Sequence, residues 1–105
     1  MVFVETPIFT RQVQYLLSED QYRDLQDELR KHPDAGSKIK GSGGLRKLRW
    51  GIEGRGKSGG VRVIYYWVVA QDRIFMVYMY PKSKQDDLSS EQLNALKKTV
   101  EKELS

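Results

Sequence analysis

The sequence contains no cysteine and only one histidine, His32, and these two shortages exclude whole classes of site. Without cysteine there are no disulfides, thiolate metal centres or cysteine nucleophiles, and the composition fits a reducing cytoplasm. A single histidine cannot supply the acid–base pair of a two-histidine nuclease. No hydrophobic run approaches the roughly 20 residues of a membrane-spanning helix, and residues 1–5 are too short a stretch for a signal peptide. We therefore expect a cytoplasmic protein with no membrane partner.

The remaining polar residues form no recognisable metal or cofactor site. Carboxylates are scattered singly, except for Asp86 and Asp87 at the entry to the last predicted helix, where negative charge favours the helix dipole. His32 precedes Pro33 at a predicted helix end, where an imidazole meets free backbone carbonyls. The glycine-rich stretch 51–60 precedes a strand rather than a helix, and no P-loop motif is present. The sequence thus predicts neither a metal nor a cofactor.

Positive charge, by contrast, is abundant and concentrated between residues 38 and 62. This segment carries eight lysines and arginines and one carboxylate, so its net charge is +7 in a chain whose formal net charge is +4. Glycines are interspersed among the cations, and an apolar run, Val61 to Val69, follows at once. Cations neutralise phosphate charge, and glycine lets a backbone approach a phosphate closely. The segment therefore predicts a phosphate-binding site in front of a buried strand.

Three helices are expected, over residues 6–17, 18–31 and 89–104. Each begins at a serine or threonine whose side chain can accept a hydrogen bond from the first turn: Thr6, Ser18 and Ser89. Glutamine follows three residues after both serines, which completes a capping-box pattern. At 105 residues the chain is long enough for one core but not for two, so we expect a single domain over residues 1–105.

Four strands are expected, over residues 1–5, 45–50, 61–69 and 73–80. The third is rich in β-branched and aromatic residues and apolar on both faces, which is typical of a central strand. Residues 34–44 and 51–60 are expected to be loops, and residues 71–72 a tight turn. The order predicts an α+β fold with a small antiparallel sheet. Its three-stranded meander gains the N-terminal strand at one edge and is covered by two N-terminal helices and a C-terminal helix.

Several cations lie on these strands or just beyond them. Alternation places Lys47 and Arg49 on one face of their strand, while Lys82 and Lys84 follow the hairpin. Such cations often protect a sheet edge or stay solvated. Arg62 differs, because an arginine at the head of an apolar central strand is shielded from water. It needs an anion there, either an internal carboxylate or a ligand phosphate.

The order of these motifs resembles a known protein family. The sequence GGLRKLR at residues 43–49 is followed by a glycine/lysine loop, then by SGGVRVIYY at residues 58–66 and by YPKS at residues 80–83. Together they resemble the toxins of type II toxin–antitoxin modules in the RelE superfamily, with the HigB-like toxins as the nearest branch. The resemblance covers nearly the whole chain. It implies a RelE-like fold and a ribosome-dependent endoribonuclease that cuts mRNA in the decoding site by 2′-hydroxyl attack, without a metal.

The resemblance implies catalytic roles for four cations. Arg62 matches a strand arginine that grips the scissile phosphate, and Lys47 and Arg49 match basic strand positions that activate the 2′-hydroxyl or stabilise the transition state. Lys82 falls where the family often has an arginine near the leaving 5′-oxygen. Leu88 occupies the place of a base-stacking tyrosine, so Tyr80 is the expected stacking face. The remaining contacts to RNA or the ribosome are expected from Lys38, Lys40, Arg46, Arg55, Lys57, Tyr80 and Lys84.

The resemblance also implies partners. These are the ribosome, its mRNA and a cognate antitoxin of the HigA-like, helix-turn-helix kind, through which alone the toxin would meet operator DNA. Two other functions remain open: a non-catalytic RNA- or ribosome-binding module with the same basic face, and a gyrase-inhibiting relative of the ParE-like branch. The presence of Lys47, Arg49, Arg62 and Lys82 argues against the gyrase-directed relative.

Overall fold

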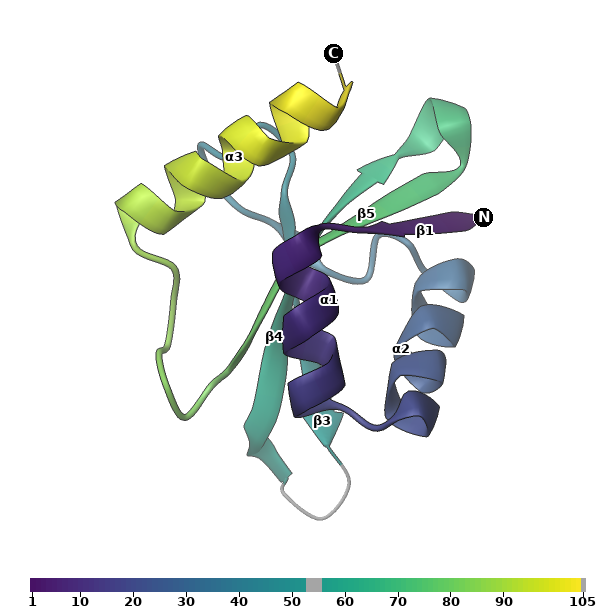
Figure 1. Cartoon of the computed structure of the whole chain (residues 1–105), viewed down its shortest axis with the longest axis vertical. Helices are drawn as coiled ribbons and strands as arrows, with labels where there is room; N and C mark the ends of the chain where they lie inside the picture. The colour runs from purple at the N-terminus through teal and green to yellow at the C-terminus, as the bar shows by residue number, and fades with distance from the viewer. Residues whose placement is uncertain (53–55, 105) are drawn as a thin grey trace.

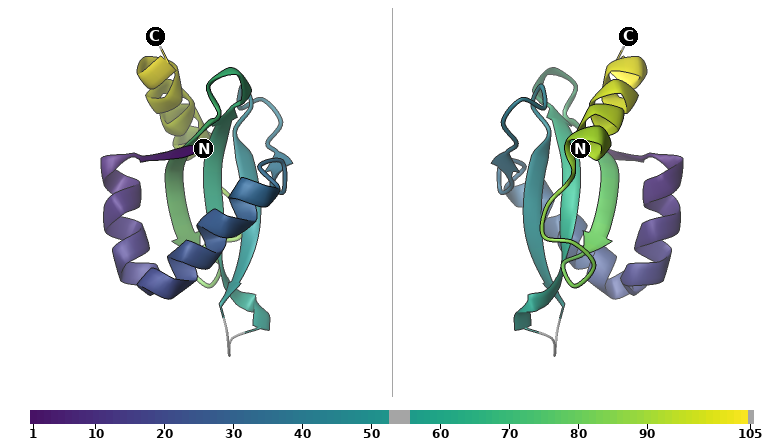
Figure 2. Two further views of the ribbon diagram at one scale, coloured as in Figure 1. Left: turned by 90° about the vertical axis from the view of Figure 1, so that its right-hand side faces the viewer. Right: turned by 90° about the vertical axis from the view of Figure 1, so that its left-hand side faces the viewer.

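The protein is a twisted sheet with helices on both faces (Figure 1). The computed structural model describes residues 1–52 and 56–104, without the side chains of residue 52 and residues 56–59. Two N-terminal helices cover one face of the sheet and the C-terminal helix packs on the other (Figure 2). Within the described ranges, no helix has the length and apolar character needed to cross a membrane.

The three helices form where the capping patterns place them: α1 (Pro7–Leu16), α2 (Glu19–Lys31) and α3 (Ser90–Leu104). The Ser18 hydroxyl accepts a hydrogen bond from Gln21 N–H, and the Gln21 side chain accepts one from Ser18 N–H, which completes the capping box. Thr6 caps α1 and also donates from Oγ1 to the Val77 carbonyl at 2.8 Å. This one side chain therefore fixes the start of α1 against the sheet.

The sheet has five strands in the order β1-β5-β4-β3-β2. Their bounds are β1 (Val2–Glu5), β2 (Ser37–Lys38), β3 (Arg46–Ile52), β4 (Gly56–Val68) and β5 (Arg73–Pro81). The expected meander of β3, β4 and β5 is present and β1 lies at an edge, but two expectations were wrong. The sheet is mixed, because β1 runs parallel to β5, and a short fifth strand, β2, extends the other edge.

Both errors have physical causes. Parallel pairing requires a long crossover between the two strands, and residues 6–72 supply it here. The direction of β1 in the sheet depends on how this crossover runs, and the alternation of side chains along β1 carries no information about it. The β2 strand lies within the expected loop 34–44 and has only two residues, so it carries no periodic signal.

The β3–β4 hairpin is longer than the sequence indicated. Residues 51–60 were expected to form a loop, yet pairing continues to Ile52 opposite Gly56. Gly60 is required by close approach, because a Cβ at this position would collide with the Trp50 carbonyl. At the other end of β4, the expected turn at residues 71–72 is a short 3₁₀ helix, Val69–Gln71, followed by Asp72 in the left-handed region at φ 48°.

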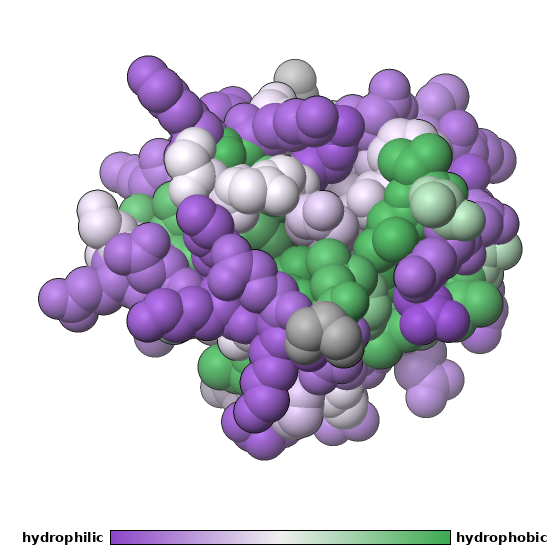
Figure 3. Space-filling model, turned by 90° about the horizontal axis from the view of Figure 1, so that it is seen from above, coloured by the Kyte–Doolittle hydropathy of each residue, from purple (hydrophilic) through white to green (hydrophobic). Residues whose placement is uncertain are grey.

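The pleat of β3, β4 and β5 divides the core into two layers. One layer packs against α1 and α2 and contains Val63, Tyr65 and Met76. The other packs against α3 and contains Ile64, Phe75 and Val77. Seen from above, apolar surface also reaches solvent at the end of the molecule that carries the β4–β5 hairpin (Figure 3); Val2, Val69 and Leu104 are among the exposed hydrophobic residues.

Candidate active site

Cations from two adjacent strands meet on the sheet face that carries α3. The register places Arg49 of β3 directly opposite Arg62 of β4, and Arg62 in turn opposite Tyr80 of β5. Lys47 lies two residues from Arg49, opposite Ile64, and so shares the same face. Like charges directly opposite each other destabilise a sheet. The Arg49–Arg62 pair is therefore a local conflict that a bound anion would relieve.

Arg62 is the most deeply buried of these cations, with only 4% of the residue exposed. No carboxylate of the described residues lies within ion-pairing distance of its guanidinium. Its hydrogen bond there is a long one, 3.5 Å from Nη1 to the Val61 carbonyl. A buried charge is costly unless it is paired and hydrogen-bonded. Of the two partners that the sequence allowed for Arg62, the internal carboxylate is thus not found in the described part of the chain.

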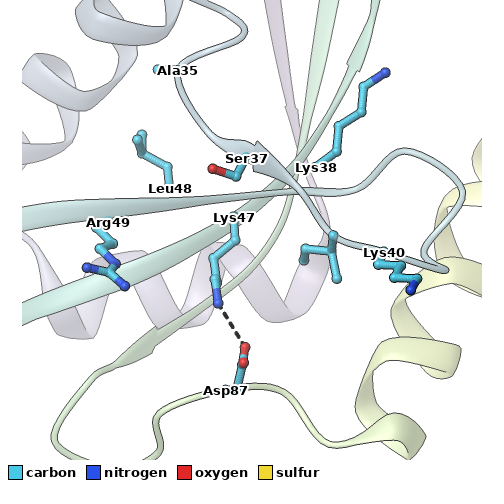
Figure 4. Close-up of a pocket in the computed structure, with 9 residues that line it drawn as sticks. Ala35, Ser37, Lys38, Lys40, Lys47, Leu48, Arg49 and Asp87 are labelled. Carbon is cyan, nitrogen blue, oxygen red and sulfur yellow. Dashed lines mark hydrogen bonds and ion pairs between the residues drawn. The ribbon is translucent and has the colours of Figure 1, made fainter.

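A cavity of about 590 Å³ opens beside Lys47 and Arg49 at the β2–β3 edge (Figure 4). Lys47 reaches across it to Asp87, with Nζ 2.9 Å from the carboxylate Oδ1. The hydrogen bond and charge of Lys47 hold the pKa of the Asp87 carboxyl below its usual range. The cavity is lined by Ala35, Ser37, Lys38, Ile39, Lys40, Lys47, Leu48, Arg49 and Asp87.

Asp87 is the site residue that sequence reasoning missed. It was expected to complement the dipole of the last helix, but its carboxylate instead bonds to a lysine 40 positions away in the chain. No local pattern reports such a pairing, because it depends on how residues 82–89 cross the sheet between β5 and α3. Its side chain is 73% exposed, so the ion pair contributes little stability.

The predicted RNA-contacting residues separate into three groups. Lys38 and Lys40 line the same cavity as Lys47 and Arg49, so the structure brings these four cations to one place. Arg46 turns to the opposite face, where its Nη1 donates to the Gly36 carbonyl at 2.8 Å and supports the preceding loop. Arg55 lies outside the described residues, as does the side chain of Lys57.

Residues that follow β5 also differ in their placement. Lys82 remains beside β4, because its N–H donates to the Gly60 carbonyl at 3.1 Å, but it does not line the Lys47 cavity. Lys84 lines a separate groove near α1 with Ile8 and Tyr15.

In the free protein, Tyr80 is not placed to stack on a base. Tyr80 is only 3% exposed and its ring packs in the core layer beneath α3, so it offers no free face to a base. Leu88, at the position expected for a stacking tyrosine, packs against the same layer.

The geometry of the described residues suits anions rather than metals. No three of the histidine, cysteine, aspartate and glutamate residues in ranges 1–52 and 56–104 gather closely enough to hold a metal ion. Instead, Lys47, Arg49 and Arg62 share one sheet face, and Lys38 and Lys40 also line the cavity that adjoins it. Such an arrangement can hold a phosphate and stabilise additional negative charge on its oxygens.

Residues 24–105 match the protein family described as "RelE toxin of RelE / RelB toxin-antitoxin system". The chain belongs to the RelE toxin family. Its fold is also similar to that of the free E. coli toxin RelE, solved as a double arginine-to-alanine mutant, with a TM-score of 0.59 and 15% sequence identity. The similarity covers 81% of this chain and 86% of E. coli RelE. The α+β arrangement of a five-stranded mixed sheet and three helices is thus a RelE fold.

Proposed function

We propose that this RelE-family protein is the toxin of a type II toxin–antitoxin module and that it cleaves mRNA bound to the ribosome. The observation that carries the proposal is Arg62, a buried guanidinium with no carboxylate in the described part of the chain, directly opposite Arg49. Two arginines in this arrangement favour occupancy by a phosphate. Family membership makes the scissile phosphate of mRNA the best candidate.

RNA supplies its own nucleophile, so the protein needs only to position the reacting atoms and stabilise charge. The 2′-oxygen attacks the adjacent phosphorus and loses its proton to a basic side chain or to water, with Lys47 and Arg49 beside it. The bond from phosphorus to the 5′-oxygen breaks, and that oxygen takes up a proton, with Lys82 as the proposed donor. The products are a 2′,3′-cyclic phosphate and a 5′-hydroxyl, and no step uses a metal.

Lys47 enters this scheme already paired. Its ammonium lies 2.9 Å from the Asp87 carboxylate, which occupies the place that a phosphate oxygen would take. An exposed ion pair of this kind is worth less than about 1 kcal/mol, so a multiply charged RNA backbone can displace it. Asp87 therefore acts as a weak internal competitor for the substrate phosphate.

The partners follow from the same proposal. The toxin acts on ribosome-bound mRNA in the cytoplasm, and a cognate antitoxin neutralises it. We place the chain in the HigB-like branch, with a HigA-like helix-turn-helix antitoxin that carries the pair to operator DNA. Expression of the chain alone should arrest growth, and co-expression of the antitoxin should relieve the arrest.

The decisive experiment compares wild type with Arg62→Ala on ribosomes that carry a defined mRNA. Arg62→Ala should abolish cleavage while the protein still associates with ribosomes, because the cations of the cavity remain. Arg23→Ala is the matched control, since Arg23 lies on α2 with a side chain that is 67% exposed. It should cleave like wild type.

Four outcomes would overturn the proposal, and the first two concern the cleavage reaction. The first is cleavage that leaves a 3′-hydroxyl and a 5′-phosphate, or that requires added magnesium at the cleavage step. The second is full cleavage by Arg62→Ala. If wild type binds ribosomes without cutting mRNA, the chain is a binding module instead, and if it inhibits DNA supercoiling by gyrase, it acts as a ParE-like toxin.

A further inference from the structure

The hydroxyl of Tyr80 is buried and has no hydrogen-bond partner among the described residues. Buried tyrosine hydroxyls usually find a partner. Tyr65, one strand away, shows the usual case: its hydroxyl donates to the Pro33 carbonyl at 2.7 Å and accepts from Gly36 N–H at 2.8 Å. The two residues are buried to a similar degree, at 0% and 3% exposure. The unsatisfied hydroxyl of Tyr80 is thus a property of its site and not of buried tyrosines in this sheet.

Tyr80 stands beside the phosphate site. It is the β5 residue directly opposite Arg62, so both side chains leave the sheet on the same face. Burial and the negative charge of Asp87 raise the pKa of the Tyr80 hydroxyl, while the positive charge of Arg62 opposes them. The hydroxyl is therefore within electrostatic reach of both charges, and it stays protonated at neutral pH, when it can donate a hydrogen bond.

Two other buried groups share this lack of a partner in the described residues, Trp67 Nε1 and Arg73 Nε. Both lie at the far end of the β4–β5 hairpin, where Trp67 pairs with Ile74 and Arg73 with Val68. Neither group lies opposite a buried cation that lacks an anionic partner. Tyr80 alone of the three combines an unused hydroxyl with a buried arginine that also lacks an anion.

On the basis of the function proposed above, we propose that the Tyr80 hydroxyl is a second ligand of the scissile phosphate. It donates its O–H to a non-bridging oxygen of the phosphate whose other oxygens face the Arg62 guanidinium. A donor at this position acts most strongly when charge increases on the phosphoryl oxygens in the transition state. Tyr80 transfers no proton in this role, and its ring stays in the core layer beneath α3.

The hydroxyl is closed off in the free protein, so binding includes an opening step. Residues 82–89 pass over the sheet face that carries α3 (Figures 1 and 2). One attachment of this segment is the exposed Lys47–Asp87 ion pair, seen in Figure 4. Others are the hydrogen bond from Lys82 N–H to the Gly60 carbonyl and the packing of Leu88 against the core layer beneath α3. A phosphate that takes the place of Asp87 on Lys47 removes one of these attachments. In the proposed opening step Leu88 also leaves the core layer, and the phosphate then reaches Arg62 and Tyr80.

The test is Tyr80→Phe, which removes only the hydroxyl and keeps the ring in the core. Single-turnover cleavage of mRNA on saturating ribosomes should slow about 10- to 100-fold, with ribosome association changed less than about twofold. Its melting temperature should stay equal to that of wild type or rise, because an unsatisfied polar group is removed. Tyr66→Phe is the matched control on β4, and it should cleave at the wild-type rate.

The outcomes separate this proposal from the function on which it rests. If wild type cleaves and Tyr80→Phe cleaves equally fast, Tyr80 is not a ligand and the proposed function stands. If wild type does not cleave, the proposed function fails, and Tyr80 is judged by the binding of inorganic phosphate to the free protein. Weaker phosphate binding by Tyr80→Phe supports the assignment, and equal binding overturns it.

A second readout requires no variant. In protein labelled with ¹³C at the tyrosine Cζ, inorganic phosphate should shift the Tyr80 resonance and leave that of Tyr65 in place. A Tyr80 resonance that does not move while phosphate shifts the Arg62 guanidinium signals would place the phosphate away from the hydroxyl and refute the assignment.

Discussion

Replacing Arg62 by methionine should stabilise the free protein while it abolishes activity. The residue is 4% exposed, and its guanidinium has five N–H donors. In the described part of the chain these donors find one long hydrogen bond and no carboxylate. Methionine fills a similar volume, has no donor to satisfy and removes the cross-strand repulsion with Arg49.

The size of the gain follows from the cost of a buried polar group without partners. That cost is about 1–3 kcal/mol and rises for a charged group, and apolar replacement of buried charges gains a similar amount in other proteins. We therefore expect Arg62→Met to raise the free energy of unfolding by about 1–3 kcal/mol. For a domain of this size, each kcal/mol corresponds to about 4–8 °C in Tm.

Urea denaturation followed by circular dichroism measures this change directly. Arg23→Met, at the exposed α2 position, should stay within about 0.5 kcal/mol of wild type. Inorganic phosphate should stabilise wild type by mass action and leave Arg62→Met unaffected. Destabilisation of Arg62→Met by more than about 1 kcal/mol would mean that the guanidinium is already satisfied in the free protein. That result would refute the proposed phosphate site.

Three further predictions concern other parts of the structure. Asp87→Asn removes the ion pair with Lys47, which is worth less than about 1 kcal/mol. The rate of cleavage at subsaturating ribosome concentration should therefore rise about two- to fivefold. The adjacent control, Asp86→Asn, should show no rise. Burial raises the pKa of Tyr22 and Tyr65 above the usual value near 10. The free energy of unfolding that these protonated hydroxyls support is complete below pH 10 and should decline as the pH rises beyond it. A fall in the urea midpoint between pH 9 and pH 11 would show this decline. Tyr65→Phe leaves the buried Gly36 N–H and the partly buried Pro33 carbonyl without their partner. Its free energy of unfolding should therefore fall by about 1–3 kcal/mol; a neutral result would show that water replaces the hydroxyl.

The parts of the fold that depend on local chemistry could be predicted from the sequence. Thr6, Ser18 and Ser89 cap helices because each cap involves residues within one turn. The direction of β1 and the existence of β2 could not be predicted, because both depend on contacts between distant segments. The length of the β3–β4 hairpin was hidden by its glycines, which favour a loop from sequence although Gly56 pairs with Ile52 and Gly60 lies within β4.

The site divides in the same way. Alternation along one strand correctly placed Lys47 and Arg49 on the same face, and the position of Arg62 at the head of an apolar strand correctly predicted its burial. The meeting of Arg49 with Arg62 required the hairpin register, which the sequence does not specify. Tyr80 was expected to stack because Leu88 occupies the place of the family's stacking tyrosine, but its β5 position places the ring in the core. No sequence pattern predicted the pairing of Asp87 with Lys47.

The parallel pairing of β1 with β5 also sets the order in which a newly made chain can become active. In the sheet, β1 pairs with β5, which is synthesised about 70 residues later, through contacts such as Val2 with Arg73. The proposed phosphate site needs β3, β4 and β5 together, since Lys47, Arg62 and Tyr80 come from one strand each. A partly synthesised chain therefore has neither a complete sheet nor a complete phosphate site. Synthesis must therefore pass Pro81, the last residue of β5, before the proposed phosphate site can form.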